Sequence, residues 1–272
     1  MSGKMSAPEL AAVLSASSVT VLPGTNPKLK RSWFVHGMLE DDRCWLDLVA
    51  ALNPPLALLP HFPWSAHGAS DWGRQAEGHQ WIGEFADQQP LPGLMVAHSY
   101  GSNALLEYLL LHPAHQPEVL VLIAPFYRAS RSQVEWETFL NLAHGLEPLL
   151  AESITIQDKR GRYAGWLLDN MVQHLRDRLG VYGWVEFLKL FLRAPDLDLT
   201  HLDCPTLIIS GANDAYSLVQ TNAELAANLP NAHHVCIPAT GHFPHITHAA
   251  QVASLIQDFV ITSGNPTNSQ KS

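Results

Sequence analysis

Short apolar runs alternate with longer amphipathic stretches over the first half of the chain. The runs predict β-strands at residues 19–22, 32–35, 56–59, 94–96 and 119–123. The stretches between them carry apolar residues at helical spacing, at residues 41–52, 71–87 and 102–111. The run at 119–123 is apolar throughout, which is typical of a strand buried on both faces of a sheet. Strands that alternate with helices indicate a mostly parallel sheet, and therefore an α/β fold.

The alternation stops after the fifth apolar run. Three stretches with helical spacing follow, at residues 133–150, 165–179 and 182–192. Strand-like runs return at residues 206–209 and 234–237, and a last helix is expected over 252–261. The pattern therefore predicts an α/β core, residues 18–125 and 202–262, with a helical cap inserted at 126–201. We expect residues 1–17 to form a lead-in and residues 263–272 a flexible tail.

Composition excludes several classes of protein. The chain has 272 residues, of which 47% are hydrophobic and 15% charged, as in a globular protein with a large core. Its net charge of −9 argues against a nucleic-acid partner, because phosphate binding needs a basic face. We find no uninterrupted apolar run of the ~18 residues that a membrane-spanning helix needs. The mildly apolar segment Leu10–Leu22 is broken by serines and a threonine, so we interpret it as lead-in and first strand rather than as a signal peptide.

The cysteines indicate a reducing compartment. Cys44, Cys204 and Cys236 are widely spaced and form no Cys-x-x-Cys pair. We interpret them as reduced thiols of a cytoplasmic protein rather than as a disulfide framework.

The segment Ala97-His98-Ser99-Tyr100-Gly101 carries the first chemical signal. It follows one apolar run and opens a helical stretch. A serine raised on a tight strand-to-helix turn needs small residues two positions before and after it, because larger ones would meet neighbouring backbone. Ala97 and Gly101 meet that need, so Ser99 is predicted to be an exposed nucleophile, with His98 packed beneath it.

A serine hydroxyl is a poor nucleophile near neutral pH without a histidine base and a carboxylate that orients the base. Asp214 follows the run at residues 206–209, and His242 lies in the loop after the run at 234–237. Carboxyl ends of parallel strands meet at one edge of a sheet, where ligands bind. We therefore expect Ser99, Asp214 and His242 to form a catalytic triad.

Acyl transfer also needs donors for a developing oxyanion. We expect the backbone amide of Tyr100, after the nucleophile, and that of Met38, after His36-Gly37, to supply them. Four side chains are expected to line the substrate pocket: His36, Trp136, Trp166 and Phe243.

Metal and nucleotide sites are not expected. His242, His245 and His248 recur every three residues, but no carboxylate or cysteine joins them at a ligand spacing, and we place His245 and His248 at the start of the last helix. No glycine-rich nucleotide motif occurs, so we expect no cofactor.

These motifs, with Gly211-Ala212-Asn213-Asp214 and Gly241-His242-Phe243, resemble those of the α/β-hydrolase fold superfamily, in its capped, serine esterase-like branch. The resemblance covers about residues 19–259 and implies a mostly parallel eight-stranded sheet, a helical cap and chemistry without a cofactor. Ala97 and Ser102 stand where the family often has glycine. A serine nucleophile argues against the haloalkane dehalogenase and epoxide hydrolase branches, which have aspartate there.

The sequence thus predicts a hydrolase that cleaves a small, fairly apolar ester through an acyl-enzyme; thioester or amide cleavage would use the same groups. Two alternatives remain open. Relatives with this triad cleave carbon–carbon bonds, which would need polar groups from the cap such as Arg162, Tyr163 or Lys189. The fold also serves as a ligand-binding receptor or scaffold. We expect a small-molecule substrate and a monomer or homodimer.

Overall fold

The computed structural model describes residues 19–158 and 160–263, which contain one seven-stranded sheet. The strands are β1 (Val19–Pro23), β2 (Ser32–Val35), β3 (Leu56–Pro60), β4 (Leu94–His98), β5 (Val119–Ile123), β6 (Thr206–Gly211) and β7 (Ala232–Ile237). Their order across the sheet is β1-β3-β2-β4-β5-β6-β7. β1 runs antiparallel to β3, and the other pairs are parallel. The expected fold class is confirmed, with seven strands in the described part of the chain where eight were expected. The expected lead-in, residues 1–17, and the tail from residue 264 onward lie outside the described residues.

The central strands owe their place to their apolar sequences. Every residue of β4, β5 and β6 is buried. Alternate side chains of β5 enter two different hydrophobic clusters, because successive residues of a strand point to opposite faces. Leu120 and Leu122 join one cluster, and Val119, Val121 and Ile123 join the other. Only a strand covered on both faces can bury all five residues.

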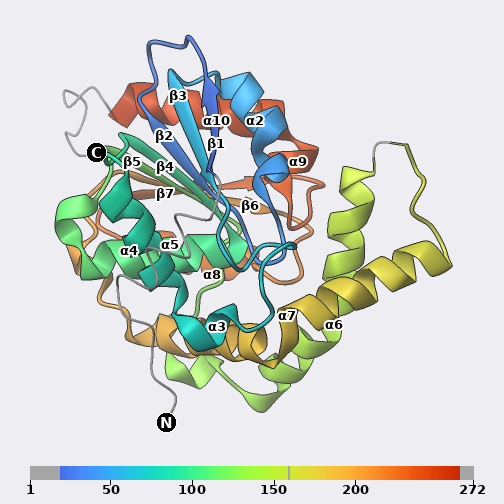
Figure 1. Ribbon diagram of the computed structural model, residues 1–272. Coiled ribbons are helices and arrows are strands. Elements are labelled where there is room, and N and C mark those ends of the chain that lie inside the picture. The colour runs from blue at the N-terminus through green and yellow to red at the C-terminus, as the bar shows by residue number, and fades with distance from the viewer. Residues whose placement is uncertain (1–18, 159, 264–272) are drawn as a thin grey trace.

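Helices supply that cover on both faces (Figure 1). α2 (Leu46–Leu52) and α10 (Ala249–Ser263) pack against each other and contribute to the cluster on one face. α4 (Gly78–Gln88), α5 (Ser99–Leu111) and α8 (Val219–Asn228) contribute to the cluster on the other. Shorter turns of helix are η1 (Asp42–Trp45), α3 (Trp72–Gln75), η2 (Pro113–His115), η3 (Arg131–Gln133), η4 (Ala194–Asp196), η5 (Leu199–His201) and α9 (Pro244–Thr247). The result is a three-layered α/β body.

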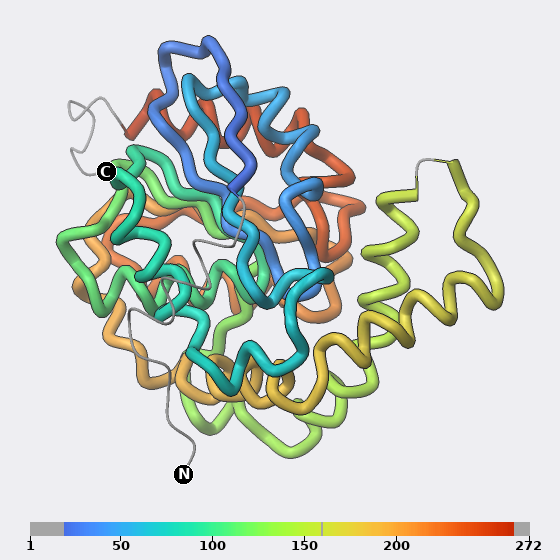
Figure 2. Tube along the Cα trace, in the orientation of Figure 1, coloured from blue at the N-terminus to red at the C-terminus, as the bar shows by residue number. Residues whose placement is uncertain are grey.

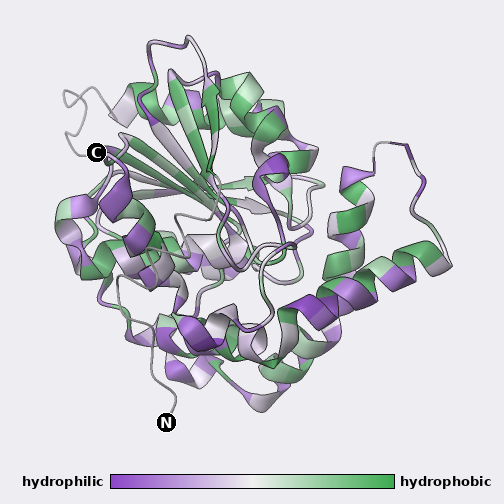
Figure 3. Cartoon of the chain, in the orientation of Figure 1, coloured by the Kyte–Doolittle hydropathy of each residue, from purple (hydrophilic) through white to green (hydrophobic). Residues whose placement is uncertain are grey.

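Two long helices lie between β5 and β6. They are α6 (Trp136–Gln157) and α7 (Trp166–Arg193), and the described residues between the two strands include no further strand. α7 bends at Gly180, where φ is 58°, which explains why the sequence predicts two helices there. The helices run beside each other, and the ends through which they connect project away from the sheet (Figure 2). Hydrophobic and hydrophilic residues mix along both helices, whereas the strands are mostly hydrophobic (Figure 3).

No helix in the described residues combines the length and hydropathy that crossing a membrane requires.

Candidate active site

Ser99 occupies a strained turn at the carboxyl edge of the sheet. β4 ends at His98, and α5 begins at Ser99, whose φ is 49°. Such a conformation costs a residue with a Cβ about 1–3 kcal/mol. Gly101 lies so close to the neighbouring strand that a Cβ there would stand 2.4 Å from the carbonyl oxygen of His36. The local sequence therefore folds as the sharp strand-to-helix turn that was predicted.

Ser99, His242 and Asp214 lie within hydrogen-bonding distance in series. Ser99 Oγ lies 2.9 Å from His242 Nε2, and His242 Nδ1 lies 2.7 Å from Asp214 Oδ2. Because a carboxylate only accepts, Nδ1 carries the proton, and Nε2 accepts from the Ser99 hydroxyl. The backbone N–H groups of Tyr216 and Ser217 donate to Asp214 Oδ1 at 2.8 and 2.9 Å. The loop after β6 thus fixes the carboxylate, and the loop after β7 fixes the histidine.

This arrangement changes the charge states of both partners. Burial acts to lower the pKa of His242, but the Asp214 carboxylate outweighs it and holds the pKa above its ordinary value of 6.5. Burial acts to raise the pKa of Asp214, but His242 and the two backbone donors hold it below its ordinary value of 3.8. Asp214 is therefore ionised at neutral pH, and His242 is set to take up a proton.

Met38 and Tyr100 line the same cavity as Ser99. Tyr100 is the second residue of α5, so its N–H has no acceptor within the helix. Within the described part of the chain the Met38 N–H donates to no protein group, while the next amide, that of Leu39, is bonded to the Trp64 carbonyl at 2.8 Å. Both residues expected to supply the donors therefore lie at the cavity, and neither amide is bonded within the described backbone.

Apolar side chains form most of the cavity wall above Ser99. The cavity encloses about 840 Å³, counting the space at its mouth. α6 and α7 line it mainly with Leu142, Leu146, Leu149, Leu150, Leu179, Trp184 and Phe187. Phe126 and the expected Phe243 complete much of the wall, and Ser153 is the one polar side chain that the described residues of α6 and α7 contribute.

Three expected pocket residues lie elsewhere, which corrects that prediction. Trp136 and Trp166, the first residues of α6 and α7, are 74% and 75% exposed and do not line the cavity. His36 is fully buried beneath the Gly37–Met38 turn, with Nδ1 2.8 Å from the Gly37 carbonyl oxygen and Nε2 accepting from the Phe62 N–H at 3.1 Å. His36 therefore supports the turn instead of contacting a ligand.

The polar residues considered for carbon–carbon cleavage do not line the cavity either. Lys189 is paired with Glu77 and Glu186 at 2.7 and 2.5 Å. Arg162 and Tyr163 line a separate surface cleft. The described residues therefore supply the cavity with no charged side chain from α6 or α7.

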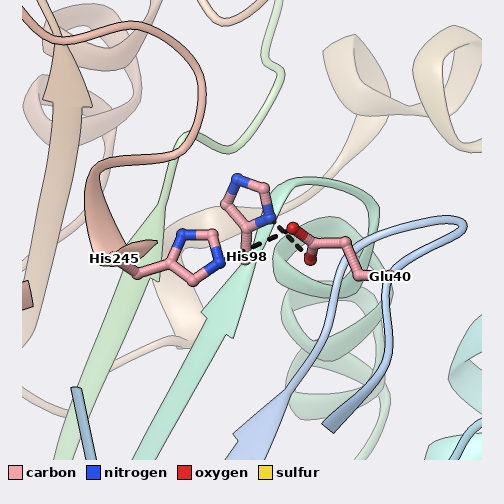
Figure 4. Close-up of side chains that lie close together, drawn as sticks. All are labelled: Glu40, His98 and His245. Atoms are coloured by element: carbon pink, nitrogen blue, oxygen red, sulfur yellow. Dashed lines mark hydrogen bonds and ion pairs between the residues drawn. The ribbon is translucent and has the colours of Figure 1, made fainter. Parts of the chain in front are cut away.

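Sequence reasoning missed a buried group behind Ser99, formed by Glu40, His98 and His245 (Figure 4). Glu40 lies after β2, His98 ends β4, and His245 lies in α9. Glu40 Oε2 lies 2.9 Å from His98 Nδ1, and Glu40 Oε1 lies 3.5 Å from His245 Nε2. Burial lowers the pKa of His245 to about 4, so its ring is neutral. No local pattern identifies Glu40, because His98 is 58 residues away along the chain.

Side chains of the types that bind metals meet at two places in the described residues. The first is the group Glu40, His98 and His245, and the second is Glu77, His79 and Glu107. In the second, Glu77 and Glu107 are both paired with Arg193. In the first, Glu40 and His98 already bond each other.

The chain is similar to a family model and to several solved structures. The model of the alpha/beta hydrolase family matches residues 34–255, and no curated protein matches the sequence. A thermophilic esterase from Thermogutta terrifontis is 18% identical, with 92% of this chain and 95% of that chain covered and a TM-score of 0.61. A putative lipase from Acinetobacter baumannii is 17% identical (96% and 98% covered, TM-score 0.67), and a putative non-heme bromoperoxidase from Mycobacterium tuberculosis 16% (91% and 96% covered, TM-score 0.59). At these identities the solved structures establish the shared fold alone.

Proposed function

This chain belongs to the alpha/beta hydrolase family, and we propose that it is a serine hydrolase that cleaves a small, fairly apolar ester. The observation that carries the proposal is the series of two hydrogen bonds, 2.9 and 2.7 Å long, that joins Ser99, His242 and Asp214 beneath an apolar cavity. The esterase and putative lipase among the structural neighbours agree with this choice of reaction.

In the proposed reaction, Ser99 Oγ attacks the ester carbonyl carbon while its proton passes to His242 Nε2. Asp214 stabilises the imidazolium that forms, and the amides of Met38 and Tyr100 donate to the oxyanion. The tetrahedral intermediate collapses when the ester C–O bond breaks and His242 returns the proton to the leaving alcohol. A water molecule, deprotonated by His242, then attacks the acyl-enzyme. The carboxylic acid leaves, and Ser99 regains its proton.

The cavity wall defines the proposed substrate class. Leucine and aromatic side chains from α6 and α7 offer dispersion contacts and no charge to pair with an ionised acyl group. A neutral ester with a hydrocarbon acyl chain therefore fits better than a charged one. We propose that these two helices act as the cap of the site, with residues 126–201 as the inserted unit.

The three cysteines are free thiols, with Cys44 and Cys204 buried. This supports a cytoplasmic location, because oxidising compartments favour disulfides.

Labelling with a fluorophosphonate probe tests the function directly. Wild-type protein is expected to gain one probe per chain at Ser99, shown by intact mass and peptide mapping. Ser99→Ala is expected to abolish the labelling. His242→Ala is expected to slow it by about 10³-fold or more, because the general base is lost. Ser102→Ala is the matched control, because Ser102 is a buried serine of the same helix whose hydroxyl bonds the Ile123 carbonyl.

A panel of neutral chromogenic esters of increasing acyl length then tests the substrate class. Turnover that disappears in Ser99→Ala supports the proposal. Folded wild-type protein that is neither labelled nor active on any ester would contradict it and favour a ligand-binding role for the cavity.

A further inference from the structure

Glu40 and His98 connect three segments of the chain that meet near Ser99. Its Oε2 accepts the Gly37 N–H at 2.6 Å and lies 2.9 Å from His98 Nδ1. The other ring nitrogen of His98, Nε2, lies 2.9 Å from the backbone carbonyl oxygen of His242. Glu40 and His98 are 4% and 0% exposed. The carboxylate therefore connects the turn before Met38, the residue before Ser99 and the backbone of His242.

The hydrogen-bond partners define where the protons lie. The His242 carbonyl oxygen can only accept, so His98 Nε2 must carry a proton. A second proton must lie between His98 Nδ1 and Glu40 Oε2 at their separation of 2.9 Å. Oε2 also accepts the short bond from the Gly37 N–H, which favours an ionised oxygen over a protonated one. The second proton therefore belongs to Nδ1, which makes His98 an imidazolium and Glu40 a carboxylate.

The surroundings agree with this assignment. Burial acts to raise the pKa of Glu40, but His98 and His245 hold it well below its ordinary value. The other titratable groups near the pair include Cys44, with Sγ 3.9 Å from Glu40 Oε2, and the rings of His242 and His245, centred 5.0 and 4.2 Å from that of His98. His36 also interacts electrostatically with Glu40, and burial lowers its pKa, so its ring is neutral. Burial raises the pKa of Cys44, so this thiol stays neutral, as does His245. Glu40 is thus the anion that compensates His98, and it lets the adjacent His242 ring take up its own proton.

We propose that Glu40 and His98 form a buried ion pair that positions the Met38 amide, Ser99 and His242 relative to one another. The inference rests on the proposed function, because it assigns the pair a role in the same acyl transfer. Neither side chain reacts with the substrate; both are positioning residues. The pair extends from the loop after β2 to the end of β4 and on to the loop after β7, so three hydrogen bonds in series connect the three parts of the site.

The charge state can be measured without any substrate. Nitrogen-15 NMR of histidine-labelled full-length protein reports whether one or both ring nitrogens carry protons, and the His98 signals are those missing from His98→Gln. We expect both nitrogens of His98 to carry protons, because the His242 carbonyl oxygen accepts from one and the Glu40 carboxylate from the other. A singly protonated ring would overturn the proposal. Purified protein with a stoichiometric metal ion on Nδ1 would overturn it too, because the metal would replace that proton.

Kinetics test the positioning role. Glu40→Gln keeps the shape of the side chain. Its one amide oxygen can still accept from the Gly37 N–H, but no negative charge remains to balance His98. We expect kcat and the fluorophosphonate labelling rate to fall about 10- to 100-fold, with KM within about threefold, because small misplacements of reacting groups cost about that much. The double variant Glu40→Gln with His98→Gln is expected to be no slower than the slower single variant, since the two side chains act as a unit.

Asp41→Asn is the matched control. It makes the same isosteric change at the next carboxylate along the chain, which bonds Arg43 instead of His98 or Gly37. Activity within about twofold of wild type is expected, and thermal unfolding of each variant checks that it folds. Additive losses in the double variant, or a Glu40→Gln loss matched by Asp41→Asn, would overturn the proposal. If the wild type turns over no ester, the proposed function fails while the NMR measurement still decides the ion pair.

Discussion

At Ser99 the backbone φ of 49° places the side chain where a regular strand or helix would not. The surrounding packing maintains this conformation, because Ala97 and Tyr100 on either side are fully buried. Gly101 then lets α5 lie against the backbone of β2, with the His36 and Val35 carbonyl oxygens 2.4 and 2.9 Å from the position of a Cβ. Strain at one residue and the absence of a side chain at another together aim the hydroxyl at His242.

The acid dependence of the proposed reaction follows from His242. The ring must be neutral to accept the Ser99 proton, so kcat/KM falls as pH drops through the pKa of His242, which Asp214 holds above 6.5. Asp214→Asn removes the charge that raises the pKa and the acceptor that selects the tautomer. We expect the acid limb to move to lower pH and kcat to fall about 10⁴-fold. A pH–rate profile of both proteins checks this, and an unmoved acid limb would count against the assignment of His242 as the base.

Among the elements, sequence predicted the strands better than the helices. Each of the seven strands overlaps an apolar run, and the runs are clearest in β4, β5 and β6, where burial on both faces favours apolar side chains. Which face of a helix is buried depends on what packs against the helix. For this reason the sequence wrongly assigned Trp136 and Trp166 to the cavity. The leucines that do line it, Leu142, Leu146 and Leu149, stand three or four residues apart on α6, a signal that marks a buried face but does not say against what.

The candidate triad was accessible from sequence because each member follows a recognisable strand. Glu40 was not, since its role depends on contacts with His98 and Gly37 that only the folded chain creates. A buried ion pair between residues far apart in the chain produces no periodic pattern in the sequence.

Ion pairs attach α7 to the body of the protein. Glu77, just before α4, lies 2.7 Å from Lys189 and 2.9 Å from Arg193, both at the end of α7. Burial acts to raise the pKa of Glu77, but the two cations lower it from 4.5 to about 2. A depressed pKa means that the contribution to stability is complete above about pH 4.5 and is lost as pH falls toward 2.

Glu77→Gln should therefore destabilise the protein at neutral pH and much less in acid. We expect a loss of about 2 kcal/mol at pH 7, or about 4–8 °C in Tm, and a shrinking difference from wild type as the pH falls. Glu84→Gln on α4 serves as the control, because the carboxylate of Glu84 forms no ion pair within the described residues. Equal Tm differences at pH 7 and pH 3 would show that the ion pairs contribute nothing.

Across the whole molecule, burial is very uneven. All residues of β4, β5 and β6 are buried, whereas α6 buries only Leu150, Ser153 and Ile154 of its 22 residues. One hydrogen bond, from the Tyr216 hydroxyl to the Gly145 carbonyl at 2.7 Å, ties α6 to the loop that carries Asp214. Local opening costs least where few apolar groups are buried, so α6 is expected to be the least stable of the long helices.

Hydrogen–deuterium exchange followed by mass spectrometry tests this distribution. Peptides from β4 and β5 should exchange slowest, and those from α6 should exchange faster by at least about tenfold, which corresponds to about 1.4 kcal/mol of opening free energy. Tyr216→Phe removes the hydrogen bond to α6 and should accelerate exchange there while leaving β5 unchanged. Protection of α6 equal to that of β5 would contradict the expected gradient.

The chain leaves the sheet at the end of β5 and re-enters at β6, its immediate neighbour. Ser99 precedes this excursion, and Asp214 and His242 follow it. Helices α6 and α7 thus occupy a stretch of the chain that contains no member of the candidate triad. Substitutions that reshape the cavity wall can therefore accumulate in one part of the gene, while the proposed catalytic residues are encoded in other parts.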